Sequence, residues 1–274
     1  MLTTNEIKSR QKAISQEFGV QKSINTQIEI DKRVSFLINQ VIKAGKKGFV
    51  LGISGGIDSF NAGSLAQLAV DSLNKMTDSK QYKFVAMRLP YDVQKDEADA
   101  IASIEAINPT EVVTYNIKPA VDAAIAEHSA NGIEITDFVK GNRKARERML
   151  AQYDVAATEN LLVIGTDHAA EAVTGFYTKW GDGAVDICPL STLNKRQGKQ
   201  MAKLLDAPEA ILNKKPTADL LDENPGQADE HELGLTYDMI DDFLEGKDID
   251  DDAARKLIIQ YDKTQHKRKS IPGV

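Results

Sequence analysis

Residues 52–59 of the chain are Gly52-Ile53-Ser54-Gly55-Gly56-Ile57-Asp58-Ser59, and they separate two contrasting patterns. The apolar run Phe49-Val50-Leu51 precedes them and is typical of a buried strand. After them, small and apolar residues recur at the spacing of one helix face, namely at Leu65, Leu68, Ala69, Ser72, Leu73 and Met76. The eight residues are therefore predicted to connect a strand to a helix.

The composition of this loop favours an anion-binding site. Small residues let the backbone approach a ligand closely, and the N–H groups and dipole at a helix start attract negative charge. The loop lacks the lysine of the GxxxxGK[ST] nucleotide loop, and its glycines do not fit GxGxxG. It carries Asp58 instead, which would repel phosphates unless a cation such as Mg²⁺ lay between them. The alternative is a glycine-rich turn that only packs.

Bulk composition narrows the class of protein. The chain has 274 residues, 42% hydrophobic and 27% charged, as in ordinary globular proteins. Its net charge of −7 gives no global basic field for nucleic acid. No apolar run reaches the roughly 18 residues of a membrane span, and no signal-peptide core is present. The one cysteine, Cys188, excludes an intrachain disulfide and is expected to be a small buried hydrophobe. We expect a cytoplasmic enzyme with no membrane or nucleic-acid partner.

Strand and helix patterns alternate along the chain. Strands are expected at 82–89, 111–117, 161–164 and 184–188, and helices at 30–41, 96–107, 119–128 and 141–159. This alternation predicts an α/β fold with a mostly parallel, doubly wound sheet flanked by helices, followed by a helical C-terminal third. Ligands of such sheets bind beyond the carboxyl ends of the strands, so Ser54, Arg88 and Thr166 are expected on one rim.

A second polar cluster, Gly165-Thr166-Asp167-His168-Ala169-Ala170-Glu171, follows the predicted strand 161–164. Asp167 and Glu171 are four residues apart and would share one face of a helix. Glu171 or Asp167 could then share a metal ion with Asp58. An ordinary helix cap, in which Thr166 or Asp167 accepts first-turn amides, accounts for the cluster equally well.

The loop sequence SGGxDS resembles the pyrophosphate-binding loop of N-type ATP pyrophosphatases, whose fold is adenine nucleotide alpha hydrolase-like. Within that superfamily the chain is similar to ammonia-dependent NAD⁺ synthetases over most of its length. The segments that carry the resemblance are Gly48–Ser59, Arg88–Pro90, Lys140–Arg148, Gly165–Lys179, Trp180–Asp186, Asn194–Gly198, Pro216–Leu220, Thr236–Gly246 and His266–Arg268. The resemblance implies a single NAD⁺ synthetase domain over residues 1–274 without a glutaminase domain. It also implies a ligase that forms NAD⁺ from deamido-NAD⁺ (nicotinic acid adenine dinucleotide) and ammonia through an acyl-adenylate, with ATP converted to AMP and pyrophosphate.

The resemblance also implies roles for individual residues. Asp58, Lys195 and Asp167 would act in catalysis, Asp167 by positioning or deprotonating ammonia, and Asp58 and Glu171 would hold Mg²⁺. ATP would be bound by Gly52, Ile53, Ser54, Gly55, Gly56, Ile57, Asp58, Ser59, Arg88, Thr166, Lys195 and Thr217. Deamido-NAD⁺ would be bound by Arg146, Lys179, Asp186, His266 and Lys267, near the interface of a homodimer.

Several of these residues have structural alternatives. Arg146 could belong to a solvated helix face, Thr217 could cap a helix after Pro216, and Asp186 could pair with a nearby arginine. Residues 266–269 could form a loose basic tail. The family usually has Gln where this chain has Ile57, and Thr where it has Phe60.

Rival functions also remain open. Other members of the superfamily are amidating and thiolating enzymes such as GMP synthetase and tRNA thiolases. Thiolation typically needs paired cysteines, and glutamine-dependent amidation needs a glutaminase nucleophile, neither of which fits a single Cys188. A nucleotide-binding regulatory protein that has lost catalysis is a rival of another class. Retention of Asp58, Glu171 and Lys195 together argues against it.

Overall fold

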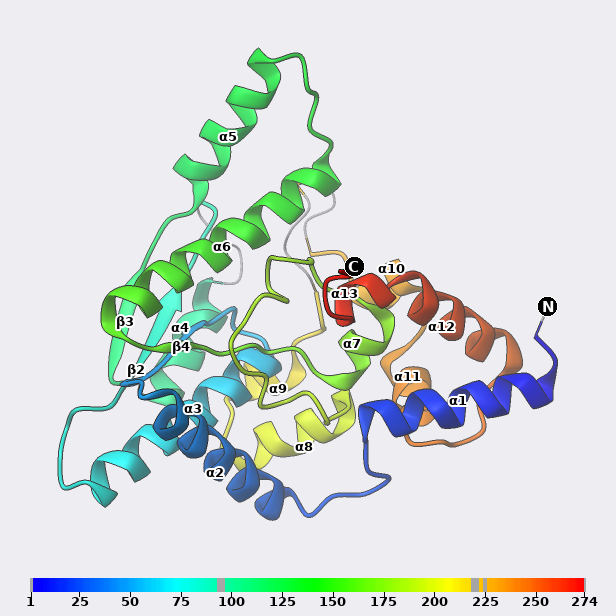
Figure 1. Cartoon of the computed structure of the whole chain (residues 1–274), viewed down its shortest axis with the longest axis horizontal. Coiled ribbons are helices and arrows are strands. Elements are labelled where there is room, and N and C mark those ends of the chain that lie inside the picture. Colours follow the sequence, from blue (N-terminus) through cyan, green and yellow to red (C-terminus); the bar gives the residue numbers. More distant parts are fainter. Residues whose placement is uncertain (1, 93–96, 218–221, 224–225, 274) are drawn as a thin grey trace.

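A parallel four-stranded sheet forms the centre of the molecule (Figure 1). The computed structural model describes residues 2–92, 97–217, 222–223 and 226–273. The strands are β1 (Gly48–Gly52), β2 (Lys83–Arg88), β3 (Glu111–Thr114) and β4 (Leu162–Val163), in the order β3-β2-β1-β4. Val50 of β1 pairs with Val85 of β2 and with Val163 of β4. The predicted parallel α/β fold is confirmed.

Helices cover the sheet and make up the C-terminal third. They are α1 (Thr4–Phe18), α2 (Thr26–Ala44), α3 (Ile57–Met76), α4 (Glu97–Ile107), α5 (Lys118–Ala130), α6 (Asp137–Glu159), α7 (Ala169–Thr174), α8 (Lys195–Leu204), α9 (Glu209–Asn213), α10 (Asp229–Leu233), α11 (Tyr237–Leu244), α12 (Asp251–Lys263) and α13 (Gln265–Arg268). None of the helices within the described ranges has the length and apolar character that a membrane crossing requires.

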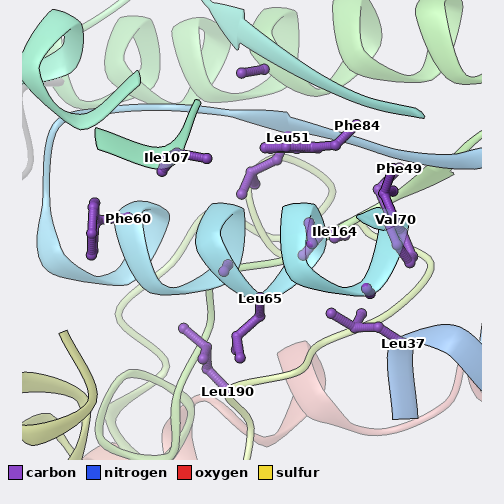
Figure 2. Packing of buried hydrophobic residues seen from close by; sticks show 14 of the residues in the cluster. Leu37, Phe49, Leu51, Phe60, Leu65, Val70, Phe84, Ile107, Ile164 and Leu190 are labelled. Atoms are coloured by element: carbon purple, nitrogen blue, oxygen red, sulfur yellow. The ribbon is translucent and has the colours of Figure 1, made fainter. Parts of the chain in front are cut away.

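Alternation along β1 divides the core between the two faces of the sheet. Phe49 and Leu51 point toward α3, where they pack with Phe84, Leu65 and the rest of the largest hydrophobic cluster (Figure 2). Val50, between them, belongs to a second cluster on the opposite face that includes residues of α5 and α6. Both faces of β1 are therefore buried, as expected for a doubly wound sheet.

A third hydrophobic cluster lies away from the sheet, among α1, α7, α11 and α12. Ile7 and Ile14 of α1 pack there with residues such as Phe243 and Leu257. The helix α1 carries a capping box at Thr3 and Glu6 and ends at Gly19. This cluster attaches the N-terminal helix to the C-terminal third of the chain.

Some predicted boundaries were wrong. Residues 184–188 do not form a strand, because only Ile187 bridges Ile164 and the chain then turns away at Pro189. The third strand ends at Thr114 rather than at residue 117, and the fourth covers only residues 162–163. The expected helix start at Asp96 and the end of the segment Pro216–Leu220 lie outside the described residues.

The strand order creates a topological switch beside β1. The chain runs from β1 outward through β2 to β3, and then returns to place β4 on the other side of β1. At such a point the loops that follow the two central strands diverge and leave a crevice. Here those loops are residues 53–56 after β1 and 164–168 after β4.

Candidate active site

A cavity of about 320 Å³ opens at this switch point. The loop after β1 lines one side of it from Gly52 to Ser59, apart from Gly55, and Gly165 and Thr166 line the side that follows β4. Thr217 and Lys195 reach it from later parts of the chain. Ser54 and Thr166 were predicted to lie on one rim because each follows a strand. Both residues line this cavity, so the prediction is confirmed for them.

The loop is shaped to present backbone N–H groups. Gly55 has φ +76°, and Gly56 precedes α3 without supplying a side chain to cap it. The hydroxyl of Ser59 lies 3.0 Å from that of Ser54 and accepts the N–H of Ser54 at 3.2 Å. These bonds fold the loop back over the first turn of α3, so the helix start faces the cavity and is suited to an anion.

Asp58, Glu171 and Lys195 meet on the cavity wall. The Lys195 ammonium donates to Asp58 Oδ2 at 2.7 Å. Burial opposes ionisation of Asp58, but attraction to Lys195 and His168 leaves the pKa of Asp58 below its ordinary value. Burial and repulsion from Asp58 raise the pKa of Glu171 well above its ordinary value. The carboxyl groups of Asp58 and Glu171 thus lie close together, and the single charge of Lys195 does not compensate both of them.

Lys195 is fixed by the start of α8. Asn194 caps this helix, and the Asp241 carboxylate accepts the N–H groups of Lys195 at 3.1 Å and Arg196 at 2.8 Å. Although burial works against its charge, attraction to Asp58 and Glu171 raises the pKa of Lys195. The lysine therefore enters the cavity as a cation.

The acid pair also fits a divalent metal ion. One ligand atom from each of Asp58, His168 and Glu171 lies within 4.8 Å of the others. Carboxylate oxygens are the ligands that Mg²⁺ prefers, and the raised pKa of Glu171 marks a place where added positive charge is favourable. The fit supports Mg²⁺ at Asp58 and Glu171 on the chemistry of the donors.

Asp167 lies beside this group but does not line the cavity among the described residues. Burial, together with repulsion from Asp182 and Asp58, raises the pKa of Asp167 to about 8. Asp182 does line the cavity, and its carboxylate accepts the N–H of Thr178 at 2.9 Å. The two acids lie next to the carboxyl groups of Asp58 and Glu171, and burial raises the pKa of both.

Two further residues predicted to contact ATP, Thr217 and Arg88, differ in whether they line the cavity. Thr217 lines the cavity and forms an isolated bridge with Ala228. Arg88 is paired with Glu97 at the start of α4 and is absent from the described cavity lining. Arg88 would have to leave Glu97, or reach past it, to contact a nucleoside.

None of the residues predicted to bind the dinucleotide is among the described residues that line the cavity, and several of them are held by protein contacts. Arg146 donates to the carbonyl of Lys179 at 3.3 Å. Asp186 accepts the N–H of Val163 at 2.8 Å and the hydroxyl of Tyr153 at 3.3 Å, rather than pairing with an arginine. Lys267 donates to the carbonyls of Gly175 and Tyr177, so residues 265–268 form the short helix α13 and not a loose tail. His266 is exposed.

Comparison with known proteins identifies the family. A family model described as NAD synthase matches residues 29–271. The chain belongs to the NAD synthase family. A protein named NH(3)-dependent NAD(+) synthetase from Halalkalibacterium halodurans is 54% identical over 260 residues, which cover 94% of this chain and 96% of that protein. One of the same name from Shewanella halifaxensis is 51% identical over 270 residues, covering 95% and 98%.

Solved structures of the NAD synthase family share this fold. An NAD+ synthetase from Burkholderia pseudomallei aligns with a TM-score of 0.83 and 46% identity, covering 96% of this chain and 97% of that one. An NMN synthetase from Francisella tularensis aligns with a TM-score of 0.81 and 37% identity, covering 92% and 99%. Proteins of this fold thus have names that differ in the nucleotide product.

The sequence patterns did not single out His168, Asp182 or Gln152. Gln152 of α6 accepts the N–H of Gly52 at 2.8 Å and so anchors the end of β1. His168 precedes Ala169 at a helix start, which was the only local signal for it. Cys188 is only partly buried, so it is not the fully buried hydrophobe that was expected, although burial raises the pKa of its thiol to about 12.

Replacing Gly55 by alanine is expected to distort the loop that joins β1 to α3. A Cβ at Gly55 would lie 2.6 Å from the backbone nitrogen of Ala100 and 2.7 Å from the carbonyl carbon of Asp99. The matched control is Gly132→Ala, at φ +74° with open space around it. We expect the control to lower the free energy of unfolding by about 1–2 kcal/mol and Gly55→Ala by clearly more. Urea denaturation measures both, and equal losses would contradict the packing argument.

Proposed function

We propose that the chain is an ammonia-dependent ligase that converts deamido-NAD⁺ to NAD⁺ with cleavage of ATP to AMP and pyrophosphate. The observation that carries this function is the convergence of the phosphate loop, the acid pair Asp58–Glu171 and Lys195 in one cavity. The match to relatives of that name over almost the whole chain supports the same reaction.

The chemistry explains why these groups are needed together. A carboxylate is a poor electrophile, so the nicotinate carboxylate must first attack the α-phosphorus of ATP to form an acyl-adenylate, with pyrophosphate leaving. Two anionic substrates therefore have to meet. The loop N–H groups from Gly52 to Ser59, with Thr166 and Thr217, would hold ATP, and the Lys195 ammonium would stabilise charge on the phosphates. Arg88 is assigned to the nucleoside side of ATP.

Mg²⁺, when bound by Asp58 and Glu171, would supply positive charge to the triphosphate and orient it. The helix start alone contributes only about 0.3–1 kcal/mol when exposed, so the loop cannot provide this stabilisation by itself. Lys195 keeps its pKa raised and therefore contributes its charge throughout the neutral pH range.

We assign the binding of deamido-NAD⁺, the second substrate, to Arg146, Lys179, Asp186, His266 and Lys267. Arg146 and Lys179 already lie together, and His266 is exposed. Lys267 and Asp186 hold the backbone around the cavity and would act on the dinucleotide from those fixed positions.

We assign Asp167 to positioning or deprotonating ammonia. Its pKa of about 8 means that the carboxyl exchanges a proton near neutral pH, as a group that accepts one from an attacking amine must. Asp182, which lines the cavity next to it, would connect Asp167 to the substrate side.

Replacing Asp167 by asparagine should stabilise the protein at alkaline pH while lowering activity. A carboxyl with a raised folded pKa binds its proton more tightly in the native state, so its contribution to stability falls as pH rises from about 4 to about 8. At pH 8 we expect the variant to be more stable than the parent by about 1–3 kcal/mol, and at pH 4 by little. Urea denaturation at both pH values tests this, with exposed Asp154→Asn as control. A pH-independent difference would contradict the assigned pKa.

We also propose a homodimer formed through α5 and α6. These helices project from the body of the molecule (Figure 1). Exposed apolar side chains gather on α6 and on the turn that precedes it, at Ile133, Phe138, Val139 and Leu150. Such a concentration is typical of an association surface. Because α6 also carries Arg146, the partner subunit would lie close to the dinucleotide.

Charge at Phe138 is expected to separate the subunits. Phe138 is 64% exposed, so Phe138→Asp should preserve the fold of each subunit while opposing burial in a dimer. Sedimentation velocity should show two chains for the parent and one for the variant. Met76→Asp is the control, because Met76 is 69% exposed at the end of α3. Identical sedimentation of all three proteins would remove α5 and α6 as the interface.

The proposed reaction is tested by incubating the protein with ATP, Mg²⁺, ammonium and deamido-NAD⁺, and separating the products by chromatography. Stoichiometric NAD⁺, AMP and pyrophosphate are expected. Nicotinic acid mononucleotide is the comparison substrate, since a protein of this fold is named NMN synthetase. Faster amidation of the mononucleotide would reassign the substrate, and ATP binding without cleavage would indicate a regulatory protein.

A cytoplasmic location is proposed with this function, since one cysteine suits a reducing compartment.

A further inference from the structure

His168 occupies the centre of the group formed by Asp58, Glu171 and Lys195. Its side chain is almost completely buried, with the residue 2% exposed. Nε2 of the ring lies 3.5 Å from Glu171 Oε1, 3.7 Å from Asp58 Oδ1 and 3.3 Å from Lys195 Nζ. The ring therefore touches every charged group of the proposed metal and phosphate site, and it is a candidate third metal ligand.

The position of the ring proton decides between a ligand and a donor. Nδ1 of His168 accepts the backbone N–H of Glu171 at 3.4 Å and so caps α7. That N–H is fixed by the helix, which means that Nδ1 must carry a lone pair and the proton of the neutral ring must sit on Nε2. The Lys195 ammonium can turn its protons to Asp58 instead, so it does not require Nε2 as an acceptor.

A metal ion bound at Nε2 would reverse this arrangement. It would need the Nε2 lone pair and would force the proton to Nδ1, where it would face the N–H of Glu171 and leave α7 uncapped. With the proton on Nε2, the N–H instead lies between the two carboxylates. At 3.5 Å from Glu171 Oε1 and 3.7 Å from Asp58 Oδ1, it attracts both carboxylates electrostatically.

We propose that His168 is a positioning residue whose Nε2–H holds the carboxylates of Asp58 and Glu171 at the spacing that a metal ion needs, without itself being a ligand. The assignment rests on the proposed function, because it takes Asp58 and Glu171 as the metal ligands. Rigidity comes from two sources. The cap fixes one side of the ring, and Tyr237 packs edge-on with ring centroids 6.2 Å apart.

The first test uses the unmodified sequence with ¹⁵N-labelled histidine. Mn²⁺ replaces Mg²⁺, and the α,β-methylene analogue of ATP prevents cleavage. Pulsed electron paramagnetic resonance then reports whether a histidine nitrogen is bonded to Mn²⁺. We expect Mn²⁺ to bind and no directly bonded ¹⁵N to be seen. A directly bonded ¹⁵N would overturn the proposal.

Two substitutions separate the two ring nitrogens. The Oδ1 of His168→Asn can replace Nδ1 in the cap but leaves no donor at the Nε2 position, whereas the amide of His168→Gln reaches the Nε2 position and caps poorly. We expect His168→Asn to weaken Mn²⁺ binding by about 10–100-fold with a nearly unchanged melting temperature. His168→Gln should bind Mn²⁺ more tightly than His168→Asn despite a lower melting temperature.

The control is Asn25→Ala, which removes the cap of α2 outside the cavity lining. It should lower the melting temperature and leave Mn²⁺ binding unchanged. Unweakened binding by His168→Asn, or weakening by all three variants in proportion to their melting temperatures, would overturn the positioning role. Failure of the parent protein to bind Mn²⁺ with the nucleotide would instead contradict the proposed function.

Discussion

Asp58→Asn is expected to lower kcat/KM by about 10²–10³ while the protein remains folded, the usual loss when one charge partner of a transition state is removed. Asp58 lies in the first turn of α3, where its carboxylate meets both the Lys195 ammonium and the neighbourhood of Glu171. Asparagine keeps the size of the side chain but cannot carry the charge that a divalent ion requires. Steady-state rates of NAD⁺ formation at several Mg²⁺ concentrations measure the loss.

The matched control for this substitution is Asp71→Asn, which makes the same change on an exposed turn of the same helix. It should leave kcat/KM and the Mg²⁺ dependence unchanged. Near-normal activity of Asp58→Asn at saturating Mg²⁺ would remove Asp58 from the metal site. A loss of rate without any change in Mg²⁺ dependence would assign Asp58 to holding Lys195 alone.

The parts of the fold predicted correctly from sequence are those encoded by short-range patterns. The run Phe49-Val50-Leu51 reads as a strand because every residue is apolar, and it is indeed buried on both faces of the sheet. The helix that follows residue 56 was visible from its 3.6-residue spacing. The position of Ser54 and Thr166 at one cavity followed from the rule that parallel strands end on a common edge.

Features that depend on distant pairing could not be predicted in this way. Asp241 fixes the start of α8 across 46 residues of sequence, and no local pattern reveals which helix end it faces. In the sequence, His168 is only a residue that precedes a helix. Its contacts with Asp58 and Lys195 come from other elements of the fold, which the local pattern does not reveal. Residues 184–188 are apolar enough for a strand, but a strand also needs bridges along its length, and among the described residues only Ile187 of this segment forms one.

Two departures from the family pattern, in or beside the loop that is predicted to bind phosphate, have a structural explanation. Phe60 is completely buried in the cluster between α3 and the sheet, so its size contributes to packing and not to ligand contact. Ile57 lines the cavity and also packs partly against the same cluster. If backbone N–H groups of the loop bind the anion, as proposed, apolar side chains at these positions leave that surface intact.

Lys195→Met is expected to lower kcat by about 10²–10³ while metal binding is retained. The substitution removes the ammonium that would neutralise phosphate charge, but it also frees Asp58 Oδ2 from its 2.7 Å bond. Mn²⁺ binding should therefore be as tight as in the parent or tighter, the opposite of the result expected for Asp58→Asn. Lys199→Met, one turn along the exposed face of α8, is the control and should change neither quantity.

A loss of Mn²⁺ binding equal to that of Asp58→Asn would mean that Lys195 acts by holding the acid pair in place. Because methionine keeps the apolar stem and removes only the charge, a retained metal site with a slow reaction would assign the missing factor to the ammonium itself.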